Sequence, residues 1–148
     1  MSLSWQKLSW EQLSKAQLYQ ILVLRAEVFV VEQECAYQDL DDQDQKATHL
    51  LGYQKQQLVA YARVFLEKKP CVIGRVVVAK THRENGFGRC VMKKCLALIP
   101  VNKTAHISAQ EHLKEFYESL GFRQSDVGYL EDGIPHIPMQ IPPKNAIA

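Results

Sequence analysis

The chain has 148 residues, of which 18 are Lys or Arg and 16 are Asp or Glu, so its formal net charge is +2. Hydrophobic residues make up 47% of the chain and aromatic residues 9%, which excludes an intrinsically disordered protein. The nearly balanced charge argues against a dedicated nucleic-acid binder, because such proteins carry a strong basic excess. The length predicts a single domain over residues 1–148.

The first residues, MSLSWQK, lack the apolar core of a secretory signal. No apolar run reaches the roughly 20 residues that a membrane-spanning helix needs. We therefore expect a cytoplasmic protein that does not enter a membrane.

Four cysteines are present, Cys35, Cys71, Cys90 and Cys95. They form no C-x-x-C pair and have no accompanying pair of histidines, so the pattern argues against a zinc site. A chain of this length can also fold without a disulfide scaffold. We predict reduced, mostly buried thiols and no metal site.

The hydrophobic periodicity predicts an early run of strands, and later strands that alternate with helices. The expected strands span residues 3–7, 48–54, 58–66, 72–79, 103–108, 122–129 and 134–141, and the expected helices span residues 16–33, 87–99 and 111–120. Asp132-Gly133 marks the turn of the last hairpin. This order predicts an α+β domain around a mixed sheet.

The first predicted helix carries two charges on an otherwise apolar face. Arg25 and Glu32 fall in line with Ile21, Val28 and Phe29 at helical spacing. One interpretation is a paired or snorkelling Arg25 with a structural role. The other is that the helix ends beside a polar cavity and contributes Arg25 and Glu32 to it.

An acidic stretch follows this helix, D-L-D-D-Q-D over residues 39–44. A calcium-binding EF-hand loop would need Gly at its sixth position and Glu at its twelfth, where this chain has Asp44 and Leu50. We therefore expect a solvated loop rather than a calcium site.

The most informative segment runs from the apolar strand at residues 72–79 into a turn with two glycines, Gly86 and Gly88, and on into a helix. Such a junction directs free backbone N–H groups and the positive end of a helix dipole at one point. Arg83 and Arg89 add positive charge. The arrangement predicts a phosphate or diphosphate site.

Two common phosphate motifs do not fit this turn. A P-loop would continue with Gly-Lys-Ser/Thr, but Arg89 and Cys90 follow Gly88. A dinucleotide fingerprint would need a third Gly or Ala where Val91 stands.

Residues 83–88, R-E-N-G-F-G, resemble the R/Q-x-x-G-x-G/A motif of the GCN5-related N-acetyltransferase (GNAT) superfamily, and residues 117–122 resemble its Y-x-x-x-G-F segment. Further segments resemble the ElaA family of bacterial acetyltransferases, in the same order along nearly the whole chain. They are R-A-E-V-F-V-V-E-Q at 25–33, Y-Q-D-L-D at 37–41, A-Y-A-R at 60–63 and E-D-G-I-P-H-I at 131–137.

The resemblance implies a mixed, mostly antiparallel sheet flanked by helices and splayed at the strand Val72–Ala79. It implies acetyl-CoA as cosubstrate, with its pantetheine arm in the splay and its diphosphate at the following turn. The residues that would bind it are Val76, Val77, Val78, Arg83, Glu84, Asn85, Gly86, Phe87, Gly88 and Arg89.

The resemblance also implies direct attack of an amine on the thioester in a ternary complex. A backbone N–H near Val76 or Val77 would stabilise the oxyanion. By its place in the Y-x-x-x-G-F segment, Tyr117 matches the family's general acid for the leaving thiolate. Taken alone, Tyr117 also reads as a core aromatic residue on one helical face with Leu113 and Phe116.

The sequence does not identify the general base that would deprotonate the acceptor amine. Many relatives carry a glutamate on the splayed strand, but residues 71–76, C-V-I-G-R-V, contain no carboxylate. The candidates are Glu32, Asp44, His49 and His136, acting directly or through water. A covalent acyl-cysteine route is disfavoured, because Cys71, the best-placed thiol, has no evident histidine partner.

The sequence therefore favours an acetyltransferase that acts on an amine of a small molecule or peptide. The alternatives are a non-catalytic acyl-CoA-binding module and a nucleotide-binding phosphate domain. The acceptor is not named by the sequence, although the acidic stretch would favour a cationic amine if it lined the pocket. A homodimer is left open.

Overall fold

A computed structural model describes residues 2–146. Its eight strands form one sheet in the order β1-β2-β3-β4-β5-β8-β6, with β7 paired to β8. The strands are β1 (Ser4–Ser9), β2 (Thr48–Gln54), β3 (Gln57–Phe65), β4 (Cys71–Val78), β5 (Ala105–Gln110), β6 (Arg123–Gln124), β7 (Tyr129–Glu131) and β8 (Ile134–Ile141). Only β4 and β5 pair in parallel. The predicted mixed, mostly antiparallel α+β sheet is confirmed.

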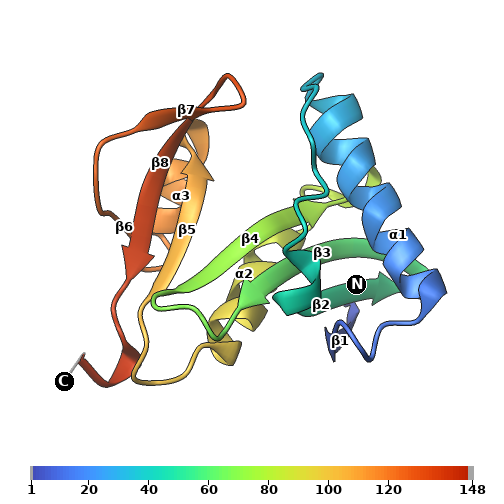
Figure 1. The fold of residues 1–148 in the computed structure, drawn as a ribbon, viewed down its shortest axis with the longest axis horizontal. Helices are drawn as coiled ribbons and strands as arrows, with labels where there is room; N and C mark the ends of the chain where they lie inside the picture. Colours follow the sequence, from blue (N-terminus) through green and yellow to red (C-terminus); the bar gives the residue numbers. More distant parts are fainter. Residues whose placement is uncertain (1, 147–148) are drawn as a thin grey trace.

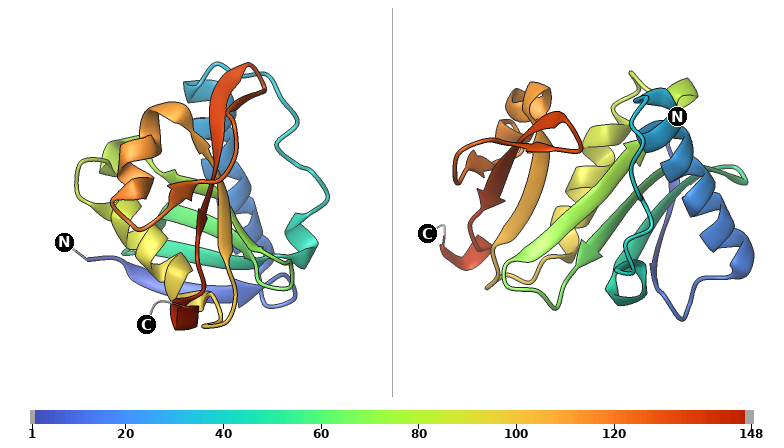
Figure 2. Two further views of the ribbon diagram at one scale, coloured as in Figure 1. Left: turned by 90° about the vertical axis from the view of Figure 1, so that its left-hand side faces the viewer. Right: turned by 45° about the horizontal axis from the view of Figure 1, so that its top comes forward.

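Helices cover both faces of the sheet (Figure 1, Figure 2). Helix α1 (Lys15–Arg25) lies on one face, and α2 (Phe87–Leu98) and α3 (Lys114–Glu118) lie on the other. Each face has its own hydrophobic cluster. The α1 side buries Ile21, Leu24, Val28, Leu51, Leu58, Tyr61 and Val77, and the α2–α3 side includes Val91, Met92, Cys95, Ile107, Tyr117, Phe122 and Met139.

The sheet splits between β4 and β5. These strands pair only where Cys71, Val72 and Ile73 meet residues 105–107, and beyond this point they diverge (Figure 1). A register shift against β3 falls in the same part of β4, where Arg75 has a φ of +52°. The rest of β4 therefore presents an unpaired edge to the gap, as predicted for the strand Val72–Ala79.

The prediction of one α-helix over residues 16–33 is wrong in its second half. The α-helix ends at Arg25, and Ala26–Glu32 is a π-helix in which the Gln33 N–H bonds the Val28 carbonyl. The β-branched valines of this segment have reduced α-helical propensity. Because a π-turn holds an extra residue, side chains here leave the α-helical spacing.

The single strand expected over residues 122–129 is also wrong, since two short strands, β6 and β7, are separated by irregular chain. Their partner β8 contains Pro135 and Pro138, which have no N–H to donate to a continuous ladder. The Ser125 N–H instead bonds the Pro138 carbonyl at 2.9 Å.

The Y-x-x-x-G-F segment is a helix C-cap. The Phe122 N–H bonds the Tyr117 carbonyl at 3.1 Å, and the Gly121 N–H bonds the Glu118 carbonyl at 3.0 Å. This is the Schellman pattern, in which the residue after the helix takes a positive φ, here +104° at Gly121. The cap fixes Phe122 edge-on against the Tyr117 ring, with 5.9 Å between ring centroids.

We predict that Gly121→Ala lowers the free energy of unfolding by about 1–3 kcal/mol. A left-handed backbone costs a non-glycine residue about 1–2 kcal/mol, and the new Cβ would lie 2.9 Å from Ile141 Cδ1, the end of a flexible side chain that must shift at a smaller further cost. Urea unfolding measures the loss. Gly133→Ala is the control, since its φ is +77° with nothing within 4 Å, and it should lose only the backbone share. Equal losses in both variants would contradict this role for the Ile141 contact.

Candidate functional site

A cleft of about 1170 Å³ occupies the gap between β4 and β5. One wall comes from β3, β4 and the chain after α1, and the other comes from β5, α3 and the β7–β8 hairpin. Of the residues singled out from the sequence, the cleft brings together Val76, Val77, Val78, Arg83, Tyr117, Glu32 and His136. Asp44 and His49 do not line it.

The loop after β4 ends in an exposed helix N-terminus. Gly86 caps α2 with a φ of +76°, and the first helical hydrogen bond joins the Cys90 N–H to the Gly86 carbonyl at 3.1 Å. The N–H groups of Phe87, Gly88 and Arg89 therefore precede the helical ladder. Together with the helix dipole they form an anion-binding position.

This loop packs against α3. Arg89 donates to Ser119 Oγ at 2.8 Å and lies over the Phe116 ring, 5.6 Å from its centroid. A Cβ at Gly88 would lie 3.9 Å from Phe116 Cζ. The helix N-terminus thus lies beside the helix that carries Tyr117. Of the other predicted loop residues, Phe87 is buried in the core, whereas Glu84 and Asn85 are exposed.

Arg83 ties the loop to the end of the π-helix. Its Nη1 and Nη2 donate to the two carboxylate oxygens of Glu32, the latter at 2.9 Å, and its Nε donates to the Val78 carbonyl at 3.1 Å. This pairing lowers the pKa of Glu32. Glu32 is therefore a charged partner of the loop arginine.

The end of β4 alternates in the direction of its backbone groups. The Ala79 N–H bonds the Val59 carbonyl of β3 at 2.8 Å, so Val77 also directs its polar groups to β3. Val78 directs its own toward the open edge, where its carbonyl meets Arg83. The open edge keeps hydrogen-bonding capacity for an added chain.

Tyr117 lies at the back of the cleft in an aromatic group. Its ring packs edge-on against Phe116 and Phe122, with 5.1 and 5.9 Å between centroids. Burial, with a smaller contribution from Cys95, raises the pKa of Tyr117 to about 12. The phenol is therefore protonated at neutral pH and can donate a proton. The interpretation of Tyr117 as a core aromatic residue is confirmed, and its place in the cleft leaves the role of general acid as a prediction.

The prediction of a solvated acidic loop at residues 39–44 is wrong. Asp39 and Asp44 are buried, and the stretch forms ion pairs with three arginines. Arg25 reaches Asp39 at 2.9 Å and Asp44 at 2.7 Å, Arg63 reaches Asp41 and Asp44, and Arg75 reaches Asp39 at 2.8 Å. We call these six residues the Arg–Asp cluster. Because its charges balance, it does not supply the negative field expected for a cationic acceptor.

His49 belongs to the support of this cluster. It is fully buried, and its Nε2 lies 2.9 Å from the Asp44 carbonyl, which can only accept. Nε2 therefore carries the hydrogen, and Nδ1 accepts from the Tyr61 hydroxyl at 2.6 Å. Burial lowers the pKa of His49. Neither His49 nor the doubly paired Asp44 is free to take a substrate proton.

Sequence reasoning missed Arg75 and Tyr37 as residues of the cleft wall. Arg75 spans from β4 to the Asp39 side chain and carbonyl, and the Tyr37 hydroxyl donates to Asp39 at 2.7 Å. The one available signal was an arginine inside an otherwise apolar strand. Its partner, 36 residues away, could not be read from that pattern.

The cysteines are free thiols. Burial raises the pKa of Cys71 and raises that of Cys95 to about 12, which disfavours thiolate formation. Cys71 donates weakly to the Leu66 carbonyl at 3.5 Å rather than meeting a histidine. Among residues 2–146 no group of three metal-ligating side chains occurs, and no helix is long and apolar enough to span a membrane.

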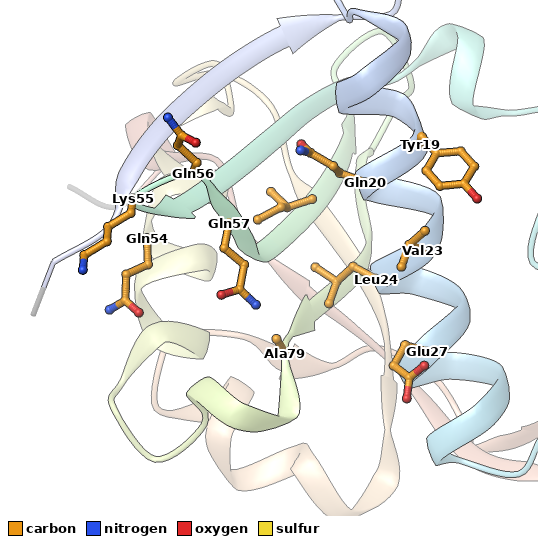
Figure 3. Close-up of a pocket in the computed structure, with 11 residues that line it drawn as sticks. Tyr19, Gln20, Val23, Leu24, Glu27, Gln54, Lys55, Gln56, Gln57 and Ala79 are labelled. Carbon is orange, nitrogen blue, oxygen red and sulfur yellow. The ribbon is translucent and has the colours of Figure 1, made fainter.

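A second groove of about 890 Å³ lies between α1 and the β2–β3 turn (Figure 3). Its lining includes Tyr19, Val23 and Glu27 from α1 and the glutamines at positions 54, 56 and 57. Of the predicted site residues none lines it. The predicted site residues that line a cavity thus lie in the cleft at the β4–β5 split, and residues 84–89 follow Arg83 in the loop and the helix N-terminus.

Comparison with known proteins gives a consistent family assignment. Residues 10–142 match the family model described as an acetyltransferase (GNAT) domain. Protein ElaA of Escherichia coli K12 is 43% identical over 145 residues, which cover 93% of this chain and 95% of that protein. The crystal structure of E. coli ElaA superposes with a TM-score of 0.87 at 42% identity, covering 94% and 99% of the two chains.

Another solved structure is described as an acyl-CoA N-acyltransferase from Pseudomonas aeruginosa. It is 37% identical, with a TM-score of 0.88, and the match covers 95% of this chain and 99% of that one. A GNAT family acetyltransferase from Elizabethkingia anophelis, described with acetyl-CoA bound, shares the fold at a TM-score of 0.64 and 11% identity.

We predict that the free energy of unfolding falls as the pH drops below about 6.5. Burial lowers the pKa of His49 and His106 in the folded chain, so the unfolded chain binds protons first and the loss ends at the lowered folded values. Each group contributes a slope of at most about 1.4 kcal/mol per pH unit. Asp41 and Asp44, whose pKa values are lowered, add a second loss below their ordinary value of 3.8.

Urea unfolding between pH 8 and pH 3 tests this dependence. His49→Gln should be less stable at pH 8 but should show a flatter dependence between about pH 6.5 and 5. An unchanged slope in that variant would contradict the role given to His49.

Proposed function

Because this chain belongs to the GNAT family of acetyltransferases and is a homologue of ElaA, we propose that it transfers an acetyl group from acetyl-CoA to an amine of a small molecule or peptide. The proposal rests on three features that lie next to one another at the cleft. The open edge of β4, the exposed N-terminus of α2 and the Tyr117 side chain all border one cleft or the loop at its end.

The residues of the loop fit a diphosphate. The N–H groups of Phe87, Gly88 and Arg89 supply directed donors, and a side chain at Gly86 would project into open space, which leaves the approach to these groups clear. Arg83 and Arg89 add positive charge beside the amides. We therefore propose that residues 83–89, including Glu84 and Asn85, bind the diphosphate, as the sequence resemblance implies.

The open edge of β4 fits the amide-containing arm of CoA. Val76 and Val78 border the gap, and an extended chain with amide groups can pair with such an edge as an added strand. The backbone N–H and carbonyl of Val77 face β3, so Val77 would not pair with the CoA arm itself but would hold Val76 and Val78 in the strand. When bound, acetyl-CoA supplies the activated acyl group.

The chain's own residues then serve the transfer. Since the Val77 N–H is directed to β3, the Val76 N–H is the candidate donor to the carbonyl oxygen on which negative charge develops. The Tyr117 hydroxyl, which is protonated at neutral pH, donates to the leaving thiolate. Direct attack requires no thiol of the protein, in line with the raised pKa of Cys71.

One observation favours an alternative, a non-catalytic acyl-CoA-binding module. Residues 71–78 of β4, CVIGRVVV, present no carboxylate to the cleft, so a strand-borne base is absent from this segment. Such a module would bind CoA equally well but release no thiol with any amine. Thiol release from acetyl-CoA against a broad amine library separates the two functions.

We predict that Gly86→Trp weakens CoA binding at least tenfold, because the indole would cover the amides of the turn. Isothermal titration calorimetry with CoA measures the affinity. Gly133→Trp is the matched control, since its φ of +77° and its open surroundings equal those of Gly86 but it lies in the β7–β8 turn. Equal affinity of the two variants for CoA would show that the diphosphate position is misplaced.

We predict that Tyr117→Phe lowers kcat by about 10²-fold or more and changes CoA affinity less than threefold. The variant keeps the ring contacts with Phe116 and Phe122 and removes only the proton donor. Steady-state thiol release and calorimetry provide the two readouts. Wild-type turnover in Tyr117→Phe would remove Tyr117 as the acid.

A further inference from the structure

The missing element of the proposed transfer is a group that takes a proton from the acceptor amine. At neutral pH an alkylamine with a pKa of about 10.4 is almost entirely an ammonium ion, which cannot attack. Of the four candidates from the sequence, Asp44 and His49 lie off the cleft, and Glu32 is held by Arg83. His136 is the candidate that the geometry leaves.

His136 lies on the face of the sheet that carries α1, opposite to the face with Tyr117. It pairs with Gln110 across β5 and β8, and side chains of such a pair share a face. The odd-numbered residues Ile137 and Met139 of β8 point to the opposite face and belong to the α2–α3 cluster. The cleft therefore connects a cofactor side bordered by α2 and α3 with an opposite side bordered by His136.

The hydrogen bonding of His136 fixes its tautomer. Nδ1 lies 2.7 Å from the Ile134 carbonyl, which can only accept, so Nδ1 carries the hydrogen. In the neutral ring the lone pair is then on Nε2. His136 as a whole is only 7% exposed and lines the cleft, and its ring stacks on Tyr129 with 6.2 Å between centroids. A basic nitrogen is thus held in place at the wall of the site.

Glu131 stands next to that nitrogen. Its Oε2 lies 3.5 Å from His136 Nε2, and its side chain is 50% exposed, so the carboxylate faces both the ring and water. Apart from its arginines, the other titratable groups that line the cleft are Glu32, Cys35, Tyr37, His106, His112, Tyr117 and Asp132. Unlike the carboxylates of the Arg–Asp cluster, Glu131 is paired with no arginine or lysine in the described chain.

We propose that His136 is the catalytic base for the acceptor, acting through Nε2, and that Glu131 is a positioning residue for a cationic alkylamine. This inference rests on the proposed acetyltransferase function. Nε2 takes one proton from the ammonium group, the freed lone pair forms the C–N bond, and the C–S bond breaks. The thiolate takes the Tyr117 proton, the second amine proton returns to Tyr117, and His136 releases its proton to water.

The test compares two acceptors, a primary alkylamine and an arylamine that is already neutral at pH 7. His136→Gln should lower kcat/KM for the alkylamine about 10²-fold or more and for the arylamine less than threefold. The acidic limb of the alkylamine pH profile should disappear in the variant. Glu131→Gln should raise KM for the alkylamine, with kcat and the arylamine reaction little changed.

Calorimetry with CoA on each variant establishes that the fold and the cofactor side are intact, and His136→Asn serves as a second variant if His136→Gln does not fold. Equal losses with both amines, or unchanged turnover with the alkylamine, would overturn the assignment of His136. Wild-type protein that binds CoA but acetylates neither amine would instead count against the proposed function itself.

Discussion

The site depends on the short pairing of β4 with β5. Three residues of β4, from Cys71 to Ile73, hold the two halves of the sheet together, and the strands then diverge. If they stayed paired, the backbone edge of β4 would be satisfied by β5 and no cleft would reach through the sheet. The bulge at Arg75 falls where the divergence begins, and it turns the strand away from its parallel neighbour.

The Arg–Asp cluster holds the wall of the cleft on the β4 side. It joins α1, β3 and β4 through arginines to one loop, and its central member, Asp44, meets Arg25 and Arg63 together. Removing one partner of a buried ion pair typically costs about 3–5 kcal/mol, because the remaining charge stays buried. The cluster thus ties together segments far apart in the sequence. Because its charge is balanced, the negative charge that our proposal requires near the acceptor comes from Glu131 and Asp132, which line the cleft.

The mixed sheet and the loop could be predicted because they follow from local patterns, whereas the splay was expected only from the family resemblance. The apolar run before Gly86, the glycine turn and the helical spacing after Phe87 each act over a few residues. The Arg–Asp cluster could not be predicted, since pairs such as Arg75 with Asp39 depend on tertiary contact and the acidic letters alone read as a solvated loop. The π-helix after Arg25 was missed for a related reason, because its spacing departs only slightly from that of an α-helix.

For the candidate site, too, some residues could be proposed from local sequence motifs, whereas others depend on tertiary contacts. The turn was proposed from a local pattern, two glycines at a helix N-terminus, and Tyr117 from the resemblance of residues 117–122 to the Y-x-x-x-G-F segment, which forms a helix C-cap. The general base was left among four residues, because the choice depends on which of them faces the cleft and which is already paired. The register of β8 against β5 and the hydrogen bond from His136 Nδ1 to Ile134 are the tertiary observations on which our proposal of His136 rests.

The central claim is that the open edge of β4 and the N-terminus of α2 together hold coenzyme A. A crystal structure of the protein with CoA tests it most directly. The account predicts diphosphate oxygens within about 3 Å of the amides of residues 87–89, and the pantetheine arm along β4 in the gap toward Tyr117. CoA bound instead in the groove between α1 and the β2–β3 turn, or a β4 edge left without the ligand, would contradict it.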